Sequence, residues 1–360
     1  MCRRLTHLGV APGATGQPIL ATETALNPGK LLERLLQLIP VMLGVSAIVF
    51  LMILVTPGDP VDIMLGEQQA SEAQREALRQ DMGLDKPALQ RFGHFLANAA
   101  TGNFGLSFYH RRPVSEVILE RLPATIELTL AALVVALLVS IPLGVLAAVR
   151  KNSWLDRLST VGSLLGISMP GFWFGLLLMI LFGVWLQWLP ISGRSDMASQ
   201  VPVVTHFLTI DALLALNFEV LGSALKHLAM PALTLGLPMA AVLMRVTRAS
   251  MLEVLRQDYV TFARAKGLPT RAVLFGHALR NALIPTVTMA ALEVGSLLGG
   301  SMIVETIFGW PGLGRVVVES IFTRNYPLIQ AAILLYALTY VLVNFLADLL
   351  YTKLNPRVRL

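Results

Sequence analysis

Three glutamates lie within or beside long apolar segments of the sequence, where an ionised side chain has a high free-energy cost. They are Glu127, Glu293 and Glu305. Carboxylates at membrane depth commonly line an ion or solute pathway, so this is the chemistry that the three residues suggest. Glu293 lies about eight residues, or roughly 12 Å, along a helix that begins at Pro285. We predict Glu293 and Glu127 as pathway residues, and a hydrated carboxylate at the membrane boundary is the alternative for Glu127 and Glu305.

A polar, basic stretch with helix signals lies between two apolar segments, from Asp258 to Pro285. Gly267 permits a left-handed helix end, and the run 272–283 is again helical and leads into Pro285, which suits the start of the next helix. One apolar face is predicted on the first short helix, formed by Tyr259, Val260, Phe262 and Ala263. A basic loop can be merely solvated. The apolar face favours instead a short helix that enters a groove on a partner.

Several kinds of chemistry have no counterpart in the sequence. There is no Gly-x4-Gly-Lys-Ser/Thr phosphate loop, so we expect no ATP hydrolysis by this chain. There is no His-Glu-x-x-His pattern and no His/Glu cluster, and Cys2 is the single cysteine, so no metal site is predicted. No potassium-filter sequence is present. We therefore predict no catalytic residues, no cofactor held by this chain and no nucleic-acid partner.

The composition assigns these residues to a membrane protein. The 360 residues are 55% hydrophobic and only 14% charged, with a mean hydropathy of +0.68. A soluble domain carries about 25% charged residues, so this chain lacks the polar side chains to cover a water-facing surface. The lipid bilayer is its predicted surrounding.

Charge-free runs then predict an all-α protein with six membrane spans. The predicted spans cover residues 35–58, 128–149, 158–193, 227–244, 282–308 and 325–347. The third run is too long for one straight helix. We expect a kink at Met169-Pro170-Gly171 and an end at Leu189-Pro190.

The distribution of basic residues predicts the orientation. The loop from Arg245 to Ile284 holds seven Lys/Arg against two acids, whereas residues 57–122 hold seven Lys/Arg against nine acids. Positively charged loops stay in the cytoplasm, so we expect the loop from Arg245 to Ile284 and both termini inside. Arg245 and Arg248 are interpreted as such topology charges. Residues 1–30 carry no apolar period and are predicted to be a disordered cytoplasmic tail.

The first outer loop, residues 57–122, is too long for a plain connection and is predicted to be a small folded cap. Residues 71–82 begin with a capping-box pattern and have helical spacing. Gly83 to Pro87 stops that helix, and Pro87 to Ala100 follows as a second, amphipathic helix. Asp59, in Pro-Gly-Asp-Pro, is interpreted as a turn residue.

The basic stretch resembles the cytoplasmic coupling loop of ATP-binding-cassette (ABC) importer permeases. Ala263, Gly267 and Leu279 fit the general pattern of that loop. The positions that depart from it, Thr261, Phe262, His277 and Arg280, resemble the dipeptide/oligopeptide and nickel permeases. Further stretches agree in order, namely Pro57–Pro60, Met82–Pro87, Gly102–Gly105, Arg121–Thr125, Val304–Phe308 and Trp310–Gly314. The resemblance extends from about residue 31 to the C-terminus.

This resemblance implies a type I importer permease domain, residues 31–360, in a bacterial inner membrane. Two such chains, this one and a paralogue, would pair and each form half of the pathway. Two ATPase subunits would bind ATP and Mg²⁺, and an extracytoplasmic binding protein would deliver the solute. Residues 252–284 would be the coupling loop, and the residues implied for ATPase coupling are Tyr259, Phe262, Ala263, Arg264, Ala265, Lys266, Gly267 and Leu268.

Two other classes of transporter remain as alternatives. An ion-coupled secondary transporter would use intramembrane carboxylates and usually has inverted repeats, but no convincing internal repeat is present. A channel is disfavoured by the coupling stretch. Within the ABC class we predict di-/oligopeptides as the solute, with glutathione and nickel complexes as the alternatives.

Overall fold

In this computed structural model, residues 28–55, 60–65, 71–81 and 83–354 are described. Almost all of the predicted N-terminal tail lies outside these ranges, and so does Asp59 with its predicted turn. Within them, all regular structure apart from one isolated bridge is helical. The all-α prediction is therefore confirmed.

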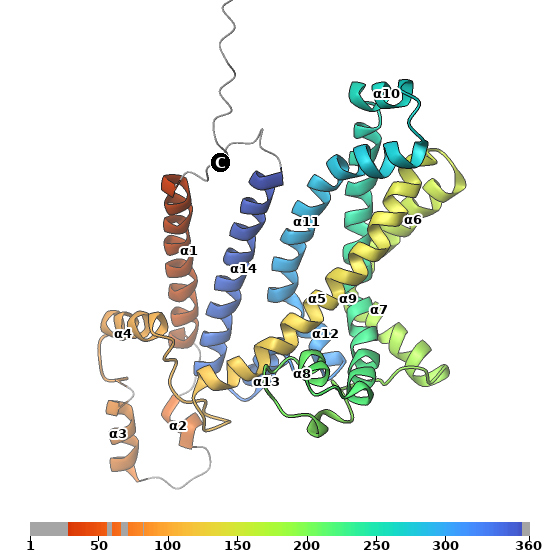
Figure 1. Ribbon diagram of the computed structural model, residues 1–360. Helices are drawn as coiled ribbons and strands as arrows, with labels where there is room; N and C mark the ends of the chain where they lie inside the picture. The colour runs from red at the N-terminus through yellow and green to blue at the C-terminus, as the bar shows by residue number, and fades with distance from the viewer. Residues whose placement is uncertain (1–27, 56–59, 66–70, 82, 355–360) are drawn as a thin grey trace, which may run out of the picture.

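The long helices lie side by side across the molecule (Figure 1). They are α1 (Pro28–Val55), α5 (Val114–Val149), α9 (Phe218–Val254), α11 (Leu279–Gly300) and α14 (Tyr326–Leu354). A π-helical turn, η3 (Ala272–Ala278), runs directly into α11. In the described ranges, five helices are long and apolar enough to cross a membrane when η3 and α11 count as one.

A sixth apolar segment is broken in two. Helix α6 (Trp154–Ser168) and the pair α7 (Gly171–Leu178) with η1 (Met179–Trp185) meet at an angle of 105°. Met169 is extended there, because a proline at position 170 disfavours helical backbone at the residue before it. The predicted kink is confirmed, and six spans result if the bent pair is one span. The helix ends at Trp185, four residues before the expected stop at Leu189.

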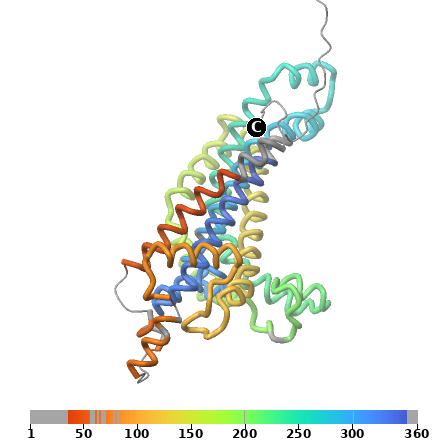
Figure 2. The backbone as a smooth tube through the Cα atoms, turned by 90° about the vertical axis from the view of Figure 1, so that its left-hand side faces the viewer, coloured from red at the N-terminus to blue at the C-terminus, as the bar shows by residue number. Residues whose placement is uncertain are grey.

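Short helices gather at the two ends of the bundle. At one end α10 (Asp258–Ala265) projects beyond the long helices, whereas the remaining short helices lie at or near the other end (Figures 1 and 2). These are α2 (Pro60–Leu65), α3 (Glu72–Asp81), α4 (Ala88–Ala100), η2 (Ala198–Gln200), α8 (Leu208–Leu214), α12 (Met302–Ile307) and α13 (Leu313–Phe322). We call these two ends the α10 end and the α4 end.

The predicted helices of the first outer loop are present. The Gln74 amide donates to Ser71 Oγ at 3.3 Å, and the Ser71 amide donates to Gln74 Oε1 at 3.0 Å. This reciprocal pair is the expected capping box, and it begins α3. Helix α4 follows after Pro87, as the second amphipathic helix was predicted to do.

The centre of the molecule is the packed pair α5 and α9, with α11 alongside. Their contact includes Ala136, Met239, Leu243 and Ala290, which are buried together. The two backbones approach closely at Gly236, where an added Cβ would lie 2.7 Å from the carbonyl oxygen of Ala132. A side chain larger than hydrogen at position 236 would therefore force the two helices apart.

Several span boundaries differ from the prediction. Helix α5, the second predicted span, begins at Val114 and not at residue 128. Helix α9, the fourth predicted span, begins at Phe218 and not at residue 227. Pro285 lies inside α11, although it was expected at the start of the helix. The reason is that a charge-free run measures the depth of hydrocarbon that a segment crosses. A helix continues past that depth wherever its charged residues find partners or water.

Candidate functional site

Helix α10 and its connections form a hairpin at one end of the bundle, residues 255–271. Helix α9 ends at Val254, and α10 begins at Asp258 after a short turn. Gly267 follows α10 with a φ of +79°, so the left-handed helix end predicted there is confirmed. Nothing lies within 4 Å of a Cβ added at Gly267, so the requirement for glycine is conformational and not steric.

The predicted apolar face of α10 is divided between two directions. Val260 is 0% exposed, and Ala263 is also buried; both pack against Val273 of η3. Phe262 is 61% exposed and Tyr259 is 41% exposed. Residues three apart share one side of a helix, so Val260 and Ala263 attach α10 to the bundle while Tyr259 and Phe262 face outward. The expectation that all four form one face for a partner was wrong.

The outward side of α10 has an apolar centre and a charged rim. A shallow depression there is lined by Asp258, Tyr259, Thr261, Phe262 and Ala265. The ammonium of Lys266 lies 4.6 Å from the centroid of the Phe262 ring. Asn281 Nδ2 donates to the Tyr259 hydroxyl at 2.8 Å, which holds the tyrosine ring.

Of the remaining predicted coupling residues, all but Ala263 are exposed. Arg264, Ala265, Lys266, Gly267 and Leu268 are exposed beside the depression. Ala263 is buried, so it can serve a contact only by supporting the helix. That these residues contact an ATPase stays a prediction. They do form a surface of the kind that receives a partner, with exposed aromatic rings and cations at its edge.

At the opposite end of α5, Glu127 is buried in an ion pair that the sequence did not predict. Arg194 donates to Glu127 Oε2 from Nε at 2.9 Å and from Nη2 at 2.6 Å. Thr209 donates to Glu127 Oε1 from its amide at 2.9 Å and from its hydroxyl at 2.5 Å. The hydrated carboxylate considered for Glu127 is therefore excluded. A pathway role for Glu127 stays a prediction, and it must now account for these partners.

Arg194 connects three parts of the chain. Besides Glu127, its Nη2 donates to the carbonyl oxygen of His206 at 2.9 Å. Its guanidinium carbon lies 5.8 Å from the ring centroid of Trp310. Nothing in the local sequence around Arg194 indicated this role, because Glu127 and Trp310 are distant along the chain.

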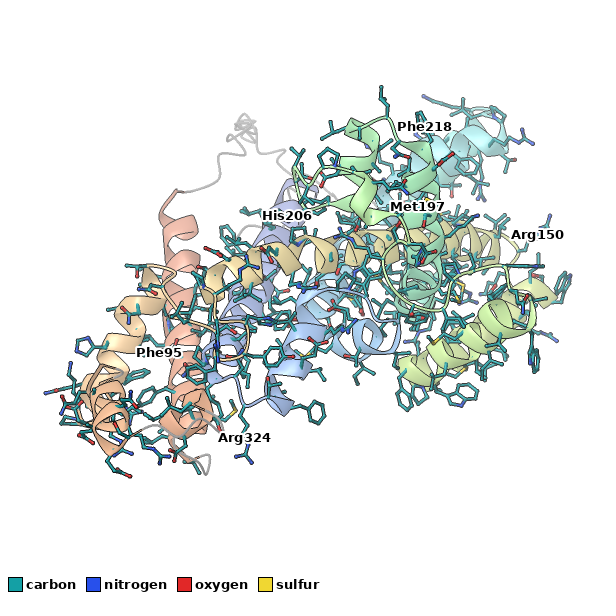
Figure 3. The ribbon with its side chains drawn as sticks, turned by 90° about the horizontal axis from the view of Figure 1, so that it is seen from below. Phe95, Arg150, Met197, His206, Phe218 and Arg324 are labelled. Atoms are coloured by element: carbon teal, nitrogen blue, oxygen red, sulfur yellow. The ribbon has the colours of Figure 1, made fainter. Side chains whose placement is uncertain are left out.

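Residues 195–217, which we call the lobe, are attached to the bundle by this ion pair. Figure 3 shows Met197, His206 and Phe218 around the lobe. Asp211 accepts hydrogen bonds from the Thr205 amide at 2.8 Å and the Thr205 hydroxyl at 2.7 Å. Burial opposes the ionised form of Asp211, but these hydrogen bonds and those from other backbone amides outweigh it and hold its pKa below the usual value.

Glu305 is fully buried, with 0% exposure, so the hydrated carboxylate considered as an alternative for it is excluded. Its Oε1 accepts from Thr125 Oγ1 and Ser301 Oγ, both at 2.8 Å, and its Oε2 accepts from the Arg315 amide at 3.1 Å. A Cβ added at Gly314 would lie 2.9 Å from Oε2. The glycines after Trp310 therefore allow the chain to close around the carboxylate, which caps the start of α13.

Glu293 differs from the other two glutamates. It is half-buried on α11, and its carboxylate forms no ion pair or hydrogen bond within the described ranges. The absence of such a partner is compatible with a water-filled pathway and leaves Glu293 the stronger of the two pathway predictions. The pathway role of Glu293 stays a prediction.

Arg248, interpreted as a topology charge, has a structural partner. Its Nε and Nη2 donate to the two oxygens of Asp156 at 2.5 and 2.9 Å. Asp156 also accepts from the Asn152 amide at 2.9 Å. The pair therefore ties α9 to the start of α6 near the α10 end.

Comparison with known proteins agrees with this arrangement over most of the chain. The family described as "Binding-protein-dependent transport system inner membrane component" matches residues 140–360. The N-terminal region of such membrane components matches residues 30–129. The two matches together include the α10 hairpin, the lobe and the whole of the first outer loop.

Individual relatives are similar along nearly their whole length. The di/tripeptide transport system permease protein DppB of Pseudomonas aeruginosa is 45% identical over 327 residues, 91% of this chain and 97% of the relative. The glutathione transport system permease protein GsiC of Escherichia coli is 42% identical over 328 residues, 91% and 98% respectively. The dipeptide transport system permease protein DppB of Alkalihalophilus pseudofirmus is 40% identical over 328 residues, again 91% and 98%.

The apolar helices and the family match thus define a multi-pass bacterial inner-membrane protein of the ABC importer permease class. Members of this class are non-catalytic membrane subunits. The chain belongs to the family of binding-protein-dependent transport system inner membrane components, with the type I permease fold.

Proposed function

We propose that this chain is one of two paralogous permease subunits of an ATP-driven importer for dipeptides and other short peptides. Two relatives are named for dipeptide or di/tripeptide transport, and these names support the solute class. Glutathione is the second candidate, because GsiC of Escherichia coli is similar over the same length. Glutathione is itself a tripeptide, so one pathway chemistry suits both solutes. Nickel complexes have no support among these relatives.

The observation that carries the proposal is the division of α10. Val260 and Ala263 fix the helix to the bundle, and Tyr259 and Phe262 remain exposed. A helix that is rigidly attached and apolar on its free side suits a groove on an ATPase subunit. ATP and Mg²⁺ would bind to that partner, and each permease of the pair would contact one ATPase.

The orientation follows from the charge distribution. The basic residues of the α10 end face the cytoplasm, and both chain termini lie on that side. The cap of residues 57–122 and the lobe then face the outside. An extracytoplasmic binding protein delivers its solute to that face. Binding of ATP at one end shifts the paired permeases between inward-open and outward-open states.

The test is reconstitution of the permease pair with its ATPases in proteoliposomes. Uptake of a labelled dipeptide should require ATP and the binding protein, and it should persist when ion gradients are collapsed. Labelled glutathione and a nickel complex are compared at the same concentration. Uptake that follows an ion gradient without ATP would refute the proposal. Preference for glutathione over every dipeptide would move the assignment to the second candidate.

A charge reversal on the hairpin tests the docking surface directly. Arg264→Glu changes an exposed side chain beside the depression, so the variant should reach the membrane at the wild-type level. It should lose ATP-driven uptake because the ATPase no longer docks. Wild-type uptake by Arg264→Glu would count against α10 as the contact.

A further inference from the structure

A pocket at the α4 end lies outside the central bundle. It has a volume of about 360 Å³ and is lined by α1, α4, the start of α14 and the segments before and after α4. No residue of α5, α9 or α11 lines it. The pocket therefore lies apart from the helices that form the core of the permease.

The pocket lies where apolar spans end. Phe50 and Leu54 come from the last turns of α1, and Tyr326 and Gln330 come from the first turns of α14. Val55, at the end of α1, is highly exposed, as expected for a side chain facing lipid. Helix α4 crosses the end of α1 (Figure 1). Lipid head groups meet hydrocarbon where apolar spans end, and amphipathic helices lie at that depth.

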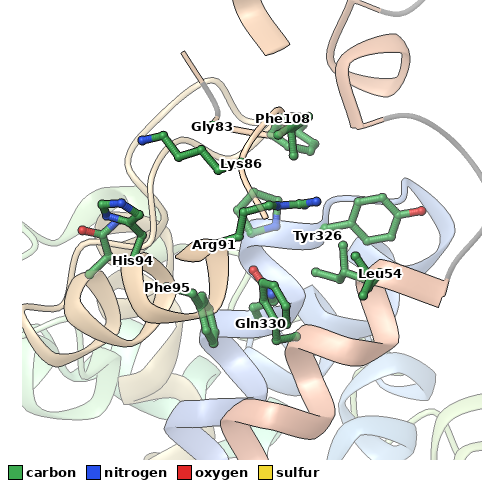
Figure 4. A pocket seen from close by; sticks show the side chains of 14 residues that line it. Leu54, Gly83, Lys86, Arg91, His94, Phe95, Phe108, Tyr326 and Gln330 are labelled. Carbon is green, nitrogen blue, oxygen red and sulfur yellow. The ribbon is translucent and has the colours of Figure 1, made fainter. Parts of the chain in front are cut away.

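The lining is basic on one side and apolar on the other. Lys86, Arg91 and His94 contribute basic side chains, and no Asp or Glu is among the lining residues that the structure describes. The guanidinium of Arg91 lies 6.0 Å from the ring centroid of Phe50 and forms no ion pair within the described ranges. Figure 4 shows Lys86 and His94 on one side of the pocket, with Arg91 directed toward Tyr326. The charge is thus available to an anion.

A buried polar group in the lining has no partner among the described residues. Tyr326 is 8% exposed, and its hydroxyl accepts and donates no hydrogen bond within the described ranges. Buried hydroxyls are normally hydrogen-bonded, but Figure 4 shows this one at the end of the ring that points away from Arg91, so the anion is placed by the basic side chains and not by Tyr326. The wall beside it is fixed, because the Phe108 amide donates to Asn325 Oδ1 at 3.1 Å and Asn325 Nδ2 donates to Ser107 Oγ at 2.7 Å.

We propose that this pocket binds the head group of an anionic phospholipid, with the phosphate near Arg91 and Lys86 and the acyl chains along α1. Basic pockets beside membrane helices recognise such head groups. With the proposed orientation, the lipid belongs to the outer leaflet. A peptide carboxylate is also an anion, but the pocket opens beside lipid-facing residues and not among the core helices. The site is independent of the proposed solute and of ATPase docking.

The test measures lipid bound to the purified full transporter. The complex is delipidated in detergent and titrated with phosphatidylglycerol or phosphatidylcholine, and bound lipid is counted by native mass spectrometry. Phosphatidylglycerol should bind more tightly than phosphatidylcholine. Arg91→Gln and Lys86→Gln should each weaken phosphatidylglycerol binding about fivefold, the usual effect of one basic residue at a membrane surface.

A matched control separates the pocket from general charge. Arg111→Gln removes the same charge from an exposed position on the same outer segment, outside the pocket, and should leave lipid binding unchanged. Asn98→Trp keeps every charge but fills the pocket, and it should weaken the binding of both lipids. Thermal unfolding without added lipid, together with recovery of the ATPases on purification, identifies variants that fail to fold.

Three results would overturn the proposal. The first is equal affinity of the wild-type complex for the two lipids. The second is equal phosphatidylglycerol binding by Arg91→Gln and Arg111→Gln. The third is displacement of phosphatidylglycerol by a dipeptide, which would assign the pocket to a peptide carboxylate. The lipid-binding measurement does not depend on ATP-driven uptake, so failure of this inference is distinguishable from failure of the proposed function.

Discussion

Substitution of Phe262 by alanine should weaken docking of the partner while leaving the folding of the chain almost unchanged. In the free chain its ring is 61% exposed, so truncation to alanine removes little buried surface and costs about 1 kcal/mol or less. If α10 enters an ATPase groove, the same ring becomes buried at the centre of the contact. Aromatic residues at such positions contribute about 2 kcal/mol or more, so Phe262→Ala should weaken docking roughly 30-fold.

Val260 provides the opposite case. It is 0% exposed and packs against Val273, Val254 and Leu255. Val260→Ala removes two buried methyl groups, which costs about 1.6 kcal/mol in transfer free energy and about 2 to 3 kcal/mol with the cavity included. The attachment of α10 should loosen, and docking should weaken only to the extent that the hairpin is disordered.

The assay uses the purified permease in nanodiscs and its ATPase. Titration gives the dissociation constant, and hydrogen exchange over residues 258–267 reports the order of the hairpin. Phe262→Ala should raise the dissociation constant with wild-type exchange, whereas Val260→Ala should accelerate exchange. Tyr259→Phe is the control, since it keeps the ring and removes only the hydrogen bond from Asn281. Wild-type docking by Phe262→Ala, or accelerated exchange equal to that of Val260→Ala, would refute the reasoning.

Four further predictions concern individual residues. Gly267→Ala should cost about 1 kcal/mol of hairpin stability because φ is +79°, and Gly267→Asn should cost less; hydrogen exchange measures both. Glu127→Gln or Arg194→Gln alone should destabilise the protein by about 3 to 5 kcal/mol, and the double variant by less than the sum, as measured by thermal unfolding. The pKa of Asp211 is lowered in the folded state, so its stabilising effect is present above the unfolded-state pKa and is lost as pH falls through the folded-state pKa. Asp211→Asn should remove that part of the pH profile of unfolding. Glu293→Gln should reduce uptake at unchanged expression, and unchanged uptake would remove Glu293 from the pathway.

Local features were predictable from the sequence because neighbouring residues determine them. The bend before Pro170 follows from the steric restriction on the residue preceding proline. The capping box at Ser71 needs only a partner three residues away. The left-handed backbone at Gly267 follows from the absence of a Cβ. Each of these was confirmed.

The carboxylate partners were not predictable, because they come from distant parts of the chain. Arg194 is 67 residues from Glu127, and Thr125 is 180 residues from Glu305. A single sequence carries no signal for such pairs. Without them a glutamate beside an apolar run suggests either a pathway or a hydrated boundary, and the buried hydrogen-bonded carboxylate is missed. The inward direction of Val260 likewise depends on Val273, across the hairpin.

The α5–α9 pair offers a mechanical connection between the α10 end and the α4 end. With 36 and 37 residues, the two helices each extend about 54 Å, which exceeds the hydrocarbon thickness of a bilayer. Near α10, Val145 and Met251 pack together with Ala278. At the other end Leu128 and Leu228 pack with Trp310, on which Arg194 lies. Each helix contains two internal prolines at which it can bend, but the close packing between α5 and α9 favours a joint shift of the pair. We therefore expect displacement of α10 to move the Glu127–Arg194 ion pair and the lobe together with the helix pair.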